Sequence, residues 1–405
     1  MKQLLTAEFF EENRTRAMQI LEGGVLVISA YAAMQRSYDA AFRFEQEANF
    51  WYLTGIEKPD WWVILDASRG KSWLVAPDVD PVHALFDGAL SFEEAQCISG
   101  IDTVLTRAAA DDLLKQTARQ HQLVYTVDQP ERADTFDFVL NPAPRDMHEW
   151  LARRFTGVQD FRGKLATLRA VKQPLEIKTI EAAIAITAHT LNSVRANLAE
   201  YHYEYEIEAD ITRGFRYAGA AGHAYDPIVA SGKNACTLHY GDNAGKLAKK
   251  SLVLIDVGAQ VQHYAADITR TYAYGEPTKR QQAVHEAVQA AHQDIIALLR
   301  PNLSVKEYSE QVDVRMKQAL VELGLITSTD DERYRQYFPH SISHGLGLDV
   351  HDSLGAPYAF ESGMVLTVEP GIYIPEEQIG VRIEDDIVIT DSGSRNLSAK
   401  LPISL

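Results

Sequence analysis

The run Ser251–Val257 (SLVLIDV) constrains the fold most, because it places a carboxylate at the end of an apolar segment. Four consecutive large aliphatic residues are typical of a strand that is buried on both faces, so we expect Asp256 to be buried as well. Eleven residues later, Asp267 opens a segment whose β-branched and aromatic content predicts a second strand that pairs back on the first. Two acids that face each other in a dry site repel. One of them must therefore bind a proton, or a cation must lie between them.

The length of the chain predicts two domains. Its 405 residues, 46% of them hydrophobic, are enough for more than one core. We place the boundary where DFRGKLATLRAVKQPLEI changes from strand-like to helical patterning, which gives domains of residues 1–170 and 171–405. No apolar run is long enough to span a bilayer, and the N-terminal segment lacks the apolar core of a secretion signal. The expected compartment is the cytoplasm.

Composition excludes several classes of protein. Only two cysteines are present, Cys97 and Cys236, which argues against a disulfide framework and against a thiolate zinc site. A formal net charge of -17 makes nucleic acid and anionic membranes poor partners. We therefore expect neither to bind.

The first domain reads as a mixed α/β unit without recognisable chemistry. A helix is predicted near residues 6–21, followed by a strand in GGVLVISA, by the hairpin WWVILDA/SWLVAP and by a strand in LVYTVD. Aromatic clusters at residues 50–52 and 61–62 would suit a ligand pocket or a subunit interface, but core packing explains them more simply.

The second domain reads as α+β with a rough internal duplication. Pro174 fits the first turn of a long helix, and a second helix is predicted over residues 206–217. Capping boxes at Thr278 and Ser304 predict two further helices, which end at Pro301 and Gly324. A helix pair followed by strands thus occurs twice.

The last third of the domain adds histidines and two more acids. Glu369 lies in an apolar run just before a Pro-Gly pair, and Glu384 lies in another run, with Arg382 two residues earlier on the same face of the predicted strand. Any one acid is readily explained by a cap or by an arginine partner. Four acids in strand-like apolar runs favour a shared cation, because unpaired buried carboxylates cost several kcal/mol each. Three histidines fall within twelve positions of an irregular segment: His340, His344 and His351.

Charge arithmetic supports two divalent ions. Four carboxylates balance two such ions, and a neutral imidazole adds a nitrogen ligand without changing the balance. Oxygen-rich ligation with one imidazole suits Mn²⁺, with Zn²⁺ or Co²⁺ as alternatives. Paired ions lower the pKa of a bridging water and hold the hydroxide as a nucleophile, which is hydrolytic chemistry. The expected ligands are Asp256, Asp267, His344, Glu369 and Glu384.

In this order and context, these residues resemble the metallopeptidase family that contains methionine aminopeptidase, aminopeptidase P and prolidase. The segments NACTLHYGDN, LVLIDVGAQ, HSISHGLGLDVHD, TVEPGIYI and VRIEDDIVIT are most similar to aminopeptidase P of bacteria. FWYLTGIEKPD and the N-terminal helix extend the resemblance to the first domain, so it covers nearly the whole chain.

The resemblance implies a pita-bread catalytic domain with pseudo-twofold symmetry, preceded by a smaller domain that helps to form oligomers, either dimers or tetramers. It also implies that the substrate is a proline-containing peptide, cleaved between an N-terminal residue and the following proline. An Xaa-Pro bond lacks an N–H group, so peptidases that require that donor fail on it.

The resemblance further implies individual roles. Asp256 would chelate one ion, Asp267 and Glu384 would bridge both, and His344 and Glu369 would complete the second site. Glu369 would also shuttle a proton, and His351 would hydrogen-bond the substrate carbonyl or the oxyanion. The positions that match the family's substrate and catalytic residues are His239, His340, His351, Tyr373 and Arg382.

Three alternatives stay open. The segments between His351 and Gly363 and between Tyr373 and Arg382 are shorter than expected for aminopeptidase P, so an Xaa-Pro dipeptidase of the prolidase type is the second hypothesis. A non-catalytic interaction module, or a metal-free hydrolase such as creatinase, is disfavoured because all five ligands are present. Methionine aminopeptidase is disfavoured by the additional N-terminal domain.

Overall fold

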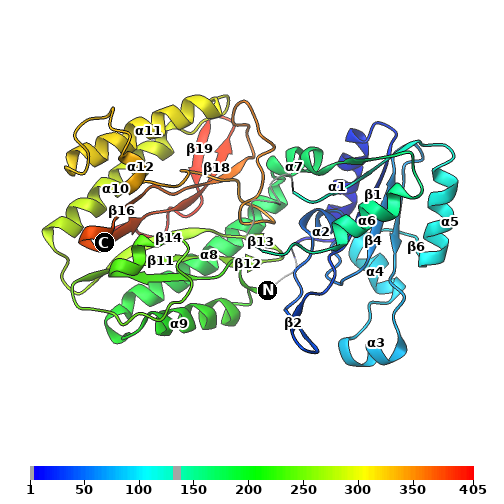
Figure 1. Ribbon diagram of the computed structural model, residues 1–405, viewed down its shortest axis with the longest axis horizontal. Coiled ribbons are helices and arrows are strands. Elements are labelled where there is room, and N and C mark those ends of the chain that lie inside the picture. Colours follow the sequence, from blue (N-terminus) through cyan, green and yellow to red (C-terminus); the bar gives the residue numbers. More distant parts are fainter. Residues whose placement is uncertain (1–3, 131–137) are drawn as a thin grey trace. The chain divides into compact units, whose positions relative to one another are not determined.

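The structure, a computed structural model, describes residues 4–130 and 138–405 (Figure 1). The chain forms two compact units, of which the first ends at Leu168 and the second begins at Arg169. Within the described ranges, no helix is long and apolar enough to cross a bilayer.

The first unit is built around a six-stranded mixed sheet with the order β6-β5-β4-β1-β7-β8. The predicted hairpin is confirmed, because β4 and β5 pair antiparallel with Trp62 opposite Val75. A separate short hairpin joins β2 to β3. The strands are β1 (Val25–Ser29), β2 (Gln35–Ser37), β3 (Ala40–Ala41), β4 (Trp62–Asp66), β5 (Lys71–Val75), β6 (Val104–Leu105), β7 (Leu123–Thr126) and β8 (Gly157–Asp160). The helices are α1 (Ala7–Ile20), α2 (Ala48–Thr54), α3 (Pro81–Asp87), α4 (Phe92–Ser99), α5 (Arg107–Thr117) and α6 (Ala143–Ala152), and α7 (Arg162–Ala170) spans the boundary.

The aromatic cluster at residues 50–52 belongs to the core. All three side chains are buried in α2. Trp51 packs edge-on against Phe10 of α1 with ring centroids 5.2 Å apart, and Tyr52 packs against Phe9 at 6.3 Å. Core packing therefore explains this cluster.

The second unit repeats one layout twice, as predicted. Helices α8 and α9 pack together and precede the sheet β10-β11-β14, whereas α10 and α11 pack together and precede the sheet β15-β18-β19 (Figure 1). The remaining strands form the sheets β13-β12-β9 and β16-β17. The helices are α8 (Pro174–Ala196), α9 (Glu204–Tyr217), α10 (Lys279–Leu298), α11 (Val305–Glu322) and α12 (Tyr334–Tyr337). The strands are β9 (Gly222–His223), β10 (Ile228–Ser231), β11 (Ser251–Val257), β12 (Ala259–Val261), β13 (Tyr264–Ala265), β14 (Ile268–Tyr274), β15 (Val365–Val368), β16 (Gly371–Ile374), β17 (Ile379–Arg382), β18 (Asp385–Thr390) and β19 (Gly393–Asn396).

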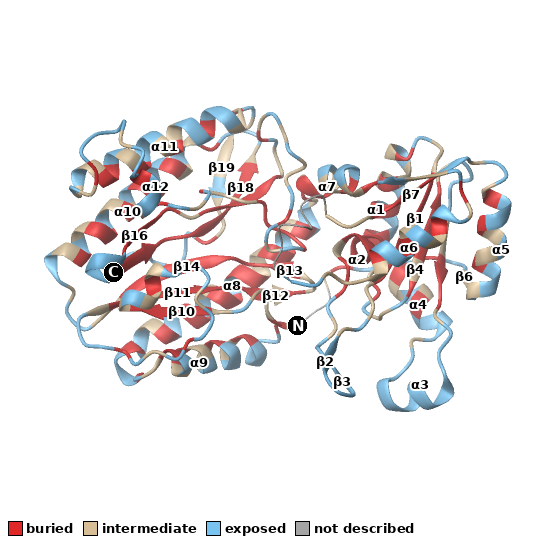
Figure 2. Ribbon diagram, viewed as in Figure 1, coloured by how far each residue is buried: buried red, intermediate tan, exposed pale blue. Residues whose placement is uncertain are grey.

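Burial follows the predicted pattern in the central strands. Every residue of β11 after Ser251 is buried, and β11 pairs antiparallel with β14 as expected (Figure 2). The helices bury one face against these strands and expose the other (Figure 2). The second half of the unit contributes a large aliphatic core that joins α10 and α11 to the strands from β15 to β18.

The helix boundaries agree with the predictions, with small differences. Helix α9 begins at Glu204, two residues before the predicted start. The capping box at Thr278 is confirmed. At Ser304 only half of the box forms, because the Glu307 carboxylate accepts a hydrogen bond from Gln311 instead of reaching back to the cap.

The expectation that all four acids lie within strands is wrong for three of them. Asp267 lies between β13 and β14, Glu369 between β15 and β16, and Glu384 between β17 and β18. Pro370 has no N–H group to donate to a strand ladder, which favours a break after Glu369. Glu384 N donates to Thr269 O at 3.1 Å. Arg382 and Glu384 therefore belong to different structural segments and do not share one strand face.

We predict that Gly258→Ala strongly destabilises the second unit. Gly258 follows β11, and a Cβ atom there would lie 1.6 Å from the carbonyl oxygen of Ala266, so the two segments that carry Asp256 and Asp267 would have to separate. The expected loss is roughly 3 kcal/mol, at the upper end of the usual cost of overpacking.

Thermal unfolding of the purified variant checks this prediction. Gly393→Ala serves as the matched control, because a Cβ at Gly393 meets nothing within 4 Å. Equal melting temperatures for the two variants would contradict the close approach at Gly258.

Buried His285 on α10 predicts acid destabilisation. Burial, followed by the charges of Arg195 and Arg270, lowers its pKa to about 4. A depressed histidine pKa means that the unfolded chain binds the proton first, so this contribution is complete above about pH 6.5 and is lost as the pH falls toward 4. When the pH falls from 7.5 to 5, we expect the unfolding free energy of His285→Gln to decrease by roughly 2 kcal/mol less than that of the unmodified protein. Denaturant unfolding at both pH values measures the difference, and parallel losses would contradict it.

Candidate metal and catalytic site

The pairing of β11 with β14 brings the first two acids together. Asp256 lies opposite Thr269 in the register, and Asp267 directly precedes β14. The hydroxyl oxygen of Tyr225 lies 2.5 Å from Asp256 Oδ1 and 2.6 Å from Asp267 Oδ1. A hydroxyl carries one proton and can donate it to only one of the two carboxylates. The predicted meeting of the two acids is confirmed, and their charges still require compensation.

Three of the five predicted ligands form a compact group. One ligand atom from each of Asp267, His344 and Glu384 lies within 4.8 Å of the other two. His344 Nε2 lies 3.4 Å from Asp267 Oδ2, whereas its Nδ1 lies 3.0 Å from the carbonyl oxygen of Gly345. A proton on Nδ1, donated to that carbonyl, leaves Nε2 to face the acids, which is the arrangement of a metal-binding histidine.

The other two predicted ligands border this group. The Arg382 guanidinium donates from Nη2 to Asp256 Oδ2. Glu369 Oε1 lies 3.6 Å from His344 Nε2, and its Oε2 lies 3.6 Å from His340 Nδ1. Asp256 is thus paired with an arginine, which is one of the explanations that would account for a single buried acid without a metal. The other carboxylate oxygen of Asp256 contacts Tyr225.

Three acids of the cluster hold their protons more tightly than free carboxyl groups do. Burial raises the pKa of Asp267, and nearby Asp256 raises it further. Burial raises the pKa of Glu369 to about 7. Burial, and after it the charges of Asp267 and Glu369, raises the pKa of Glu384 well above its ordinary value.

The pKa of His344 is shifted in the opposite direction to those of His340 and His351. Burial opposes its protonation, but the hydrogen bond and charge of Asp267 raise its pKa to about 9. The raised pKa values of His344 and of three carboxyl groups show that the cluster attracts positive charge. A divalent cation would supply that charge directly, and oxygen ligands with one imidazole suit such ions, so the residues present fit a metal site.

A hydrogen-bonded chain leads away from the acids. Arg382 Nη1 donates to the Tyr373 hydroxyl at 2.8 Å, and that hydroxyl lies 2.9 Å from His340 Nε2. Burial lowers the pKa of His340 to about 4, so its ring is neutral. His340 Nδ1 donates to the carbonyl oxygen of Ser341 at 2.7 Å, which leaves Nε2 to accept from Tyr373. Both ring nitrogens of His340 thus have protein partners.

His351 lies beside His344, one of the predicted ligands. Their ring centroids are 4.2 Å apart. Burial lowers the pKa of His351 to about 4, and His344 and His239 lower it further. His351 is therefore neutral and has an N–H group to donate. Exposed His239 lies close enough to affect its charge.

Sequence reasoning missed two residues that contact the acids. Tyr225 touches Asp256 and Asp267 from the loop before β10 and lies in no recognisable pattern. Thr269 donates to Glu384 Oε2 at 2.7 Å and accepts from Arg382 Nε at 3.1 Å. Thr269 lies two residues after Asp267 in a predicted strand, and residues two apart in a strand point to the same side. This spacing could have placed Thr269 beside the acids.

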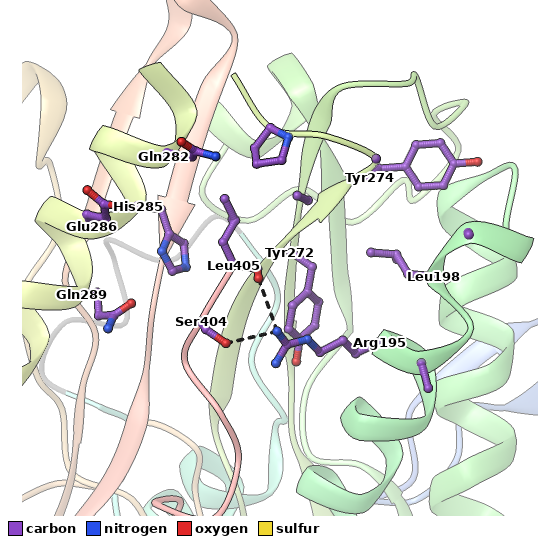
Figure 3. A pocket seen from close by; sticks show the side chains of 15 residues that line it. Arg195, Leu198, Tyr272, Tyr274, Gln282, His285, Glu286, Gln289, Ser404 and Leu405 are labelled. Atoms are coloured by element: carbon purple, nitrogen blue, oxygen red, sulfur yellow. Dashed lines mark hydrogen bonds between the residues drawn. The ribbon is translucent and has the colours of Figure 1, made fainter. Parts of the chain in front are cut away.

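A cavity of about 720 Å³ lies elsewhere in the second unit and is lined by none of the predicted site residues (Figure 3). It lies between the end of α8, the end of β14, α10 and the last residues of the chain. Figure 3 shows Arg195 beside Tyr272, donating to Ser404 Oγ at 3.1 Å and to Leu405 O at 3.3 Å. A smaller cavity of about 220 Å³ includes His340 in its lining, together with Tyr308 and Phe338.

Comparisons with known families match both units. Residues 178–391 match the model of metallopeptidase family M24, and residues 10–125 match that of the aminopeptidase P N-terminal domain. The chain is 35% identical to the Xaa-Pro aminopeptidase of Haemophilus influenzae, covering 98% of this chain and 95% of that protein. It is 34% identical to the Xaa-Pro aminopeptidase of Escherichia coli, covering 99% and 96%.

Solved structures agree over the same length. Aminopeptidase P of Escherichia coli with the inhibitor Pro-Leu superposes with a TM-score of 0.85 at 31% identity, covering 98% of this chain and 96% of that one. Proline aminopeptidase P II of Yersinia pestis superposes with a TM-score of 0.84 at 32% identity, covering 98% and 97%. The expected fold, a pita-bread domain after a smaller N-terminal domain, is confirmed. The chain belongs to metallopeptidase family M24 and carries the N-terminal domain of aminopeptidase P.

Proposed function

We propose that this protein is an Xaa-Pro aminopeptidase, a metallopeptidase that hydrolyses the bond between the N-terminal residue of a peptide and a following proline. The observation that carries the proposal is the group of Asp267, His344 and Glu384, whose ligand atoms lie within 4.8 Å of one another. The sequence around this group is similar, along nearly the whole chain, to that of relatives named for this activity.

We propose five residues as ligands of two divalent ions. Asp267, His344 and Glu384 would hold them at the centre of the cluster, and Asp256 and Glu369 would complete the set from its border. When bound, such ions lower the pKa of water toward neutrality and polarise a carbonyl group, which is the chemistry that amide hydrolysis requires. Support comes from the raised carboxyl pKa values and from the charge that His344 takes up beside the acids.

Glu369 is the proposed proton carrier. The nitrogen of proline needs a proton when it leaves as an amine, and a carboxyl group beside the reacting atoms can accept the proton of the attacking water and return it to that nitrogen. Glu369 lies within the cluster, 3.6 Å from His344 Nε2. Neutral His351 is the proposed donor to the oxygen of the scissile carbonyl, where negative charge develops.

The remaining residues are proposed to bind and orient the substrate. His239 is exposed near His351, at the open side of the site. Arg382 and Tyr373 form one connected chain with His340. Because both nitrogens of His340 are engaged, we propose that His340 acts by holding Tyr373 in place.

An Xaa-Pro dipeptidase is the second candidate. The observation that favours it is the tight connection between β16 and β17, which consists of a short 3₁₀ turn at Pro375–Glu377 and Gln378. A short connection between the strands that carry Tyr373 and Arg382 leaves fewer contacts for the part of the substrate beyond proline.

Several finer assignments accompany the proposal. We propose manganese as the metal, with zinc or cobalt as alternatives, and the Escherichia coli relative has also been solved in a zinc-substituted form. We propose a homo-oligomer, dimer or tetramer, on the family resemblance. The cytoplasm is the proposed compartment, in keeping with two free cysteines. We also propose residues 1–170 and 171–405 as the functional domains, with the chemistry in the second.

We predict that His344→Ala and Asp267→Asn each lose bound metal and activity. Removing one ligand from a site in which each ion has few protein ligands weakens binding and leaves the acids without compensation. We expect the amount of bound metal to fall below about two ions per chain, and kcat/KM to decrease at least about 1000-fold.

Elemental analysis and hydrolysis assays after reconstitution with Mn²⁺, Zn²⁺ or Co²⁺ measure both quantities. Asp330→Asn is the matched control, since it makes the same acid-to-amide change at an exposed position. Full activity in a metal-free His344→Ala protein would end the proposal.

Substrate length separates the two candidates. We predict that the Mn²⁺-loaded protein releases the first residue from Xaa-Pro-Yaa tripeptides and acts at least about tenfold more slowly on Xaa-Pro dipeptides, a difference of about 1.4 kcal/mol in the barrier. Product analysis by liquid chromatography gives both rates, with Xaa-Ala-Yaa as the control for proline selectivity. The reverse preference would establish the dipeptidase instead.

A further inference from the structure

The segment from His344 to Asp352 is a closed loop that carries two site histidines at its ends. Gly345 and Asp352 form an antiparallel bridge, in which Asp352 N donates to Gly345 O at 2.8 Å. His344 directly precedes this bridge on one side, and His351 directly precedes Asp352 on the other. The bridge therefore sets the 4.2 Å separation of the two imidazole rings.

Asp352 is held from behind by two buried cations. Its Oδ1 accepts from Arg169 Nη2 at 2.8 Å, and its Oδ2 accepts from Lys172 Nζ at 3.2 Å. Lys172 Nζ also donates to the carbonyl oxygen of Arg169 at 2.7 Å. The side chains of the three residues are 1–5% exposed, so solvent hardly screens these contacts. We call Arg169, Lys172 and Asp352 the buried clamp.

The carboxylate of Asp352 is also packed against the loop itself. A Cβ atom at Gly347 would lie 2.2 Å from Asp352 Oδ2, so the loop passes directly over the clamp. Ala265 N, just before the segment that carries Asp267, donates to Gly347 O at 2.9 Å. Movement of Asp352 would therefore displace the main chain on which both histidines depend.

A buried ion cluster is a poor source of net stability, because desolvation of the charges offsets their attraction. Such a cluster provides a fixed geometry instead, because charged hydrogen bonds hold a carboxylate in one place. The cluster lies at the base of a loop whose two ends enter the site, which is where a fixed geometry has a consequence for chemistry.

On this basis, and resting on the proposed function, we propose that Asp352 is a positioning residue for hydrolysis: clamped by Arg169 and Lys172, it holds His351 against His344 and over the scissile carbonyl. Its carboxylate binds Arg169 and Lys172, so it acts on the reaction through His351. Arg169 and Lys172 lie on either side of the predicted domain boundary. In this proposal they help to position a catalytic residue.

The test is a double-mutant cycle between Asp352→Asn and His351→Ala. Asparagine keeps the size of the side chain and the main-chain bridge but loses the charge that binds Lys172. In the otherwise unmodified protein we expect Asp352→Asn to lower kcat about 10- to 100-fold, as for other residues that orient a catalytic group, with KM changed less than about threefold and metal content unchanged. In the His351→Ala background, the same change should lower kcat less than about twofold, because the group it positions is already gone.

A matched control is available in the same loop. Asp349 Oδ2 contacts the same guanidinium, Arg169 Nη2, at 2.7 Å, but its side chain is 57% exposed. Asp349→Asn should leave kcat within about twofold of the unmodified protein. If Asp352→Asn alone does not fold, the cycle is run with Asp352→Asn/Lys172→Met, which removes the cation left without its partner.

The outcomes are distinguishable. Equal fold-losses on Asp352→Asn with and without His351 would show that Asp352 supports only the fold, and would overturn this inference while leaving the proposed function intact. A metal-loaded, unmodified protein that does not cleave Xaa-Pro-Yaa peptides would overturn the proposed function and this inference with it.

Discussion

Mutual repulsion among three buried carboxylates, those of Asp256, Asp267 and Glu384, and the partly buried carboxylate of Glu369 is the constraint on which the site depends. Asp267, Glu369 and Glu384 lie around His344, whereas Asp256 pairs with the guanidinium of Arg382. Burial alone would favour neutral acids, and the raised pKa values show how the charge is relieved when protons are the available cations. Divalent ions relieve the same repulsion and leave the acids ionised, which links metal binding directly to the charge of the site.

The scaffold keeps the acids together against this repulsion. The two halves of the second unit meet where strands end, and the segments bearing Glu369 and Glu384 bond across to neighbouring main chain. Arg270 reinforces the meeting point from behind. It is almost completely buried and donates to Glu384 O at 2.7 Å, to Asp385 Oδ1 at 2.7 Å and to Leu401 O at 3.0 Å. Rigid placement of the acids is thus a property of the main chain around them, which is the condition for a preorganised site.

Local patterns in the sequence were sufficient to predict most elements and the set of candidate residues. The strand at 251–257, its pairing with the segment after Asp267 and the capping box at Thr278 depend on neighbours in sequence, and all were confirmed. The break at Glu384 depends on which sheet the chain joins next, which periodicity does not encode. Tyr225 and the pairing of Lys172 with Asp352, 180 residues away, likewise follow from the tertiary fold and could not be predicted from spacing.

The most direct test of the central claim, that these acids converge on divalent ions, is anomalous X-ray diffraction at the manganese edge from crystals grown with Mn²⁺. The account predicts two anomalous peaks roughly 3.5–4 Å apart, the usual separation in two-metal sites, with carboxylate oxygens of Asp267 and Glu384 between them and His344 Nε2 bound to one. Maps with no anomalous density among these residues, while Asp256 stays paired with Arg382 and His344 with Asp267, would contradict it.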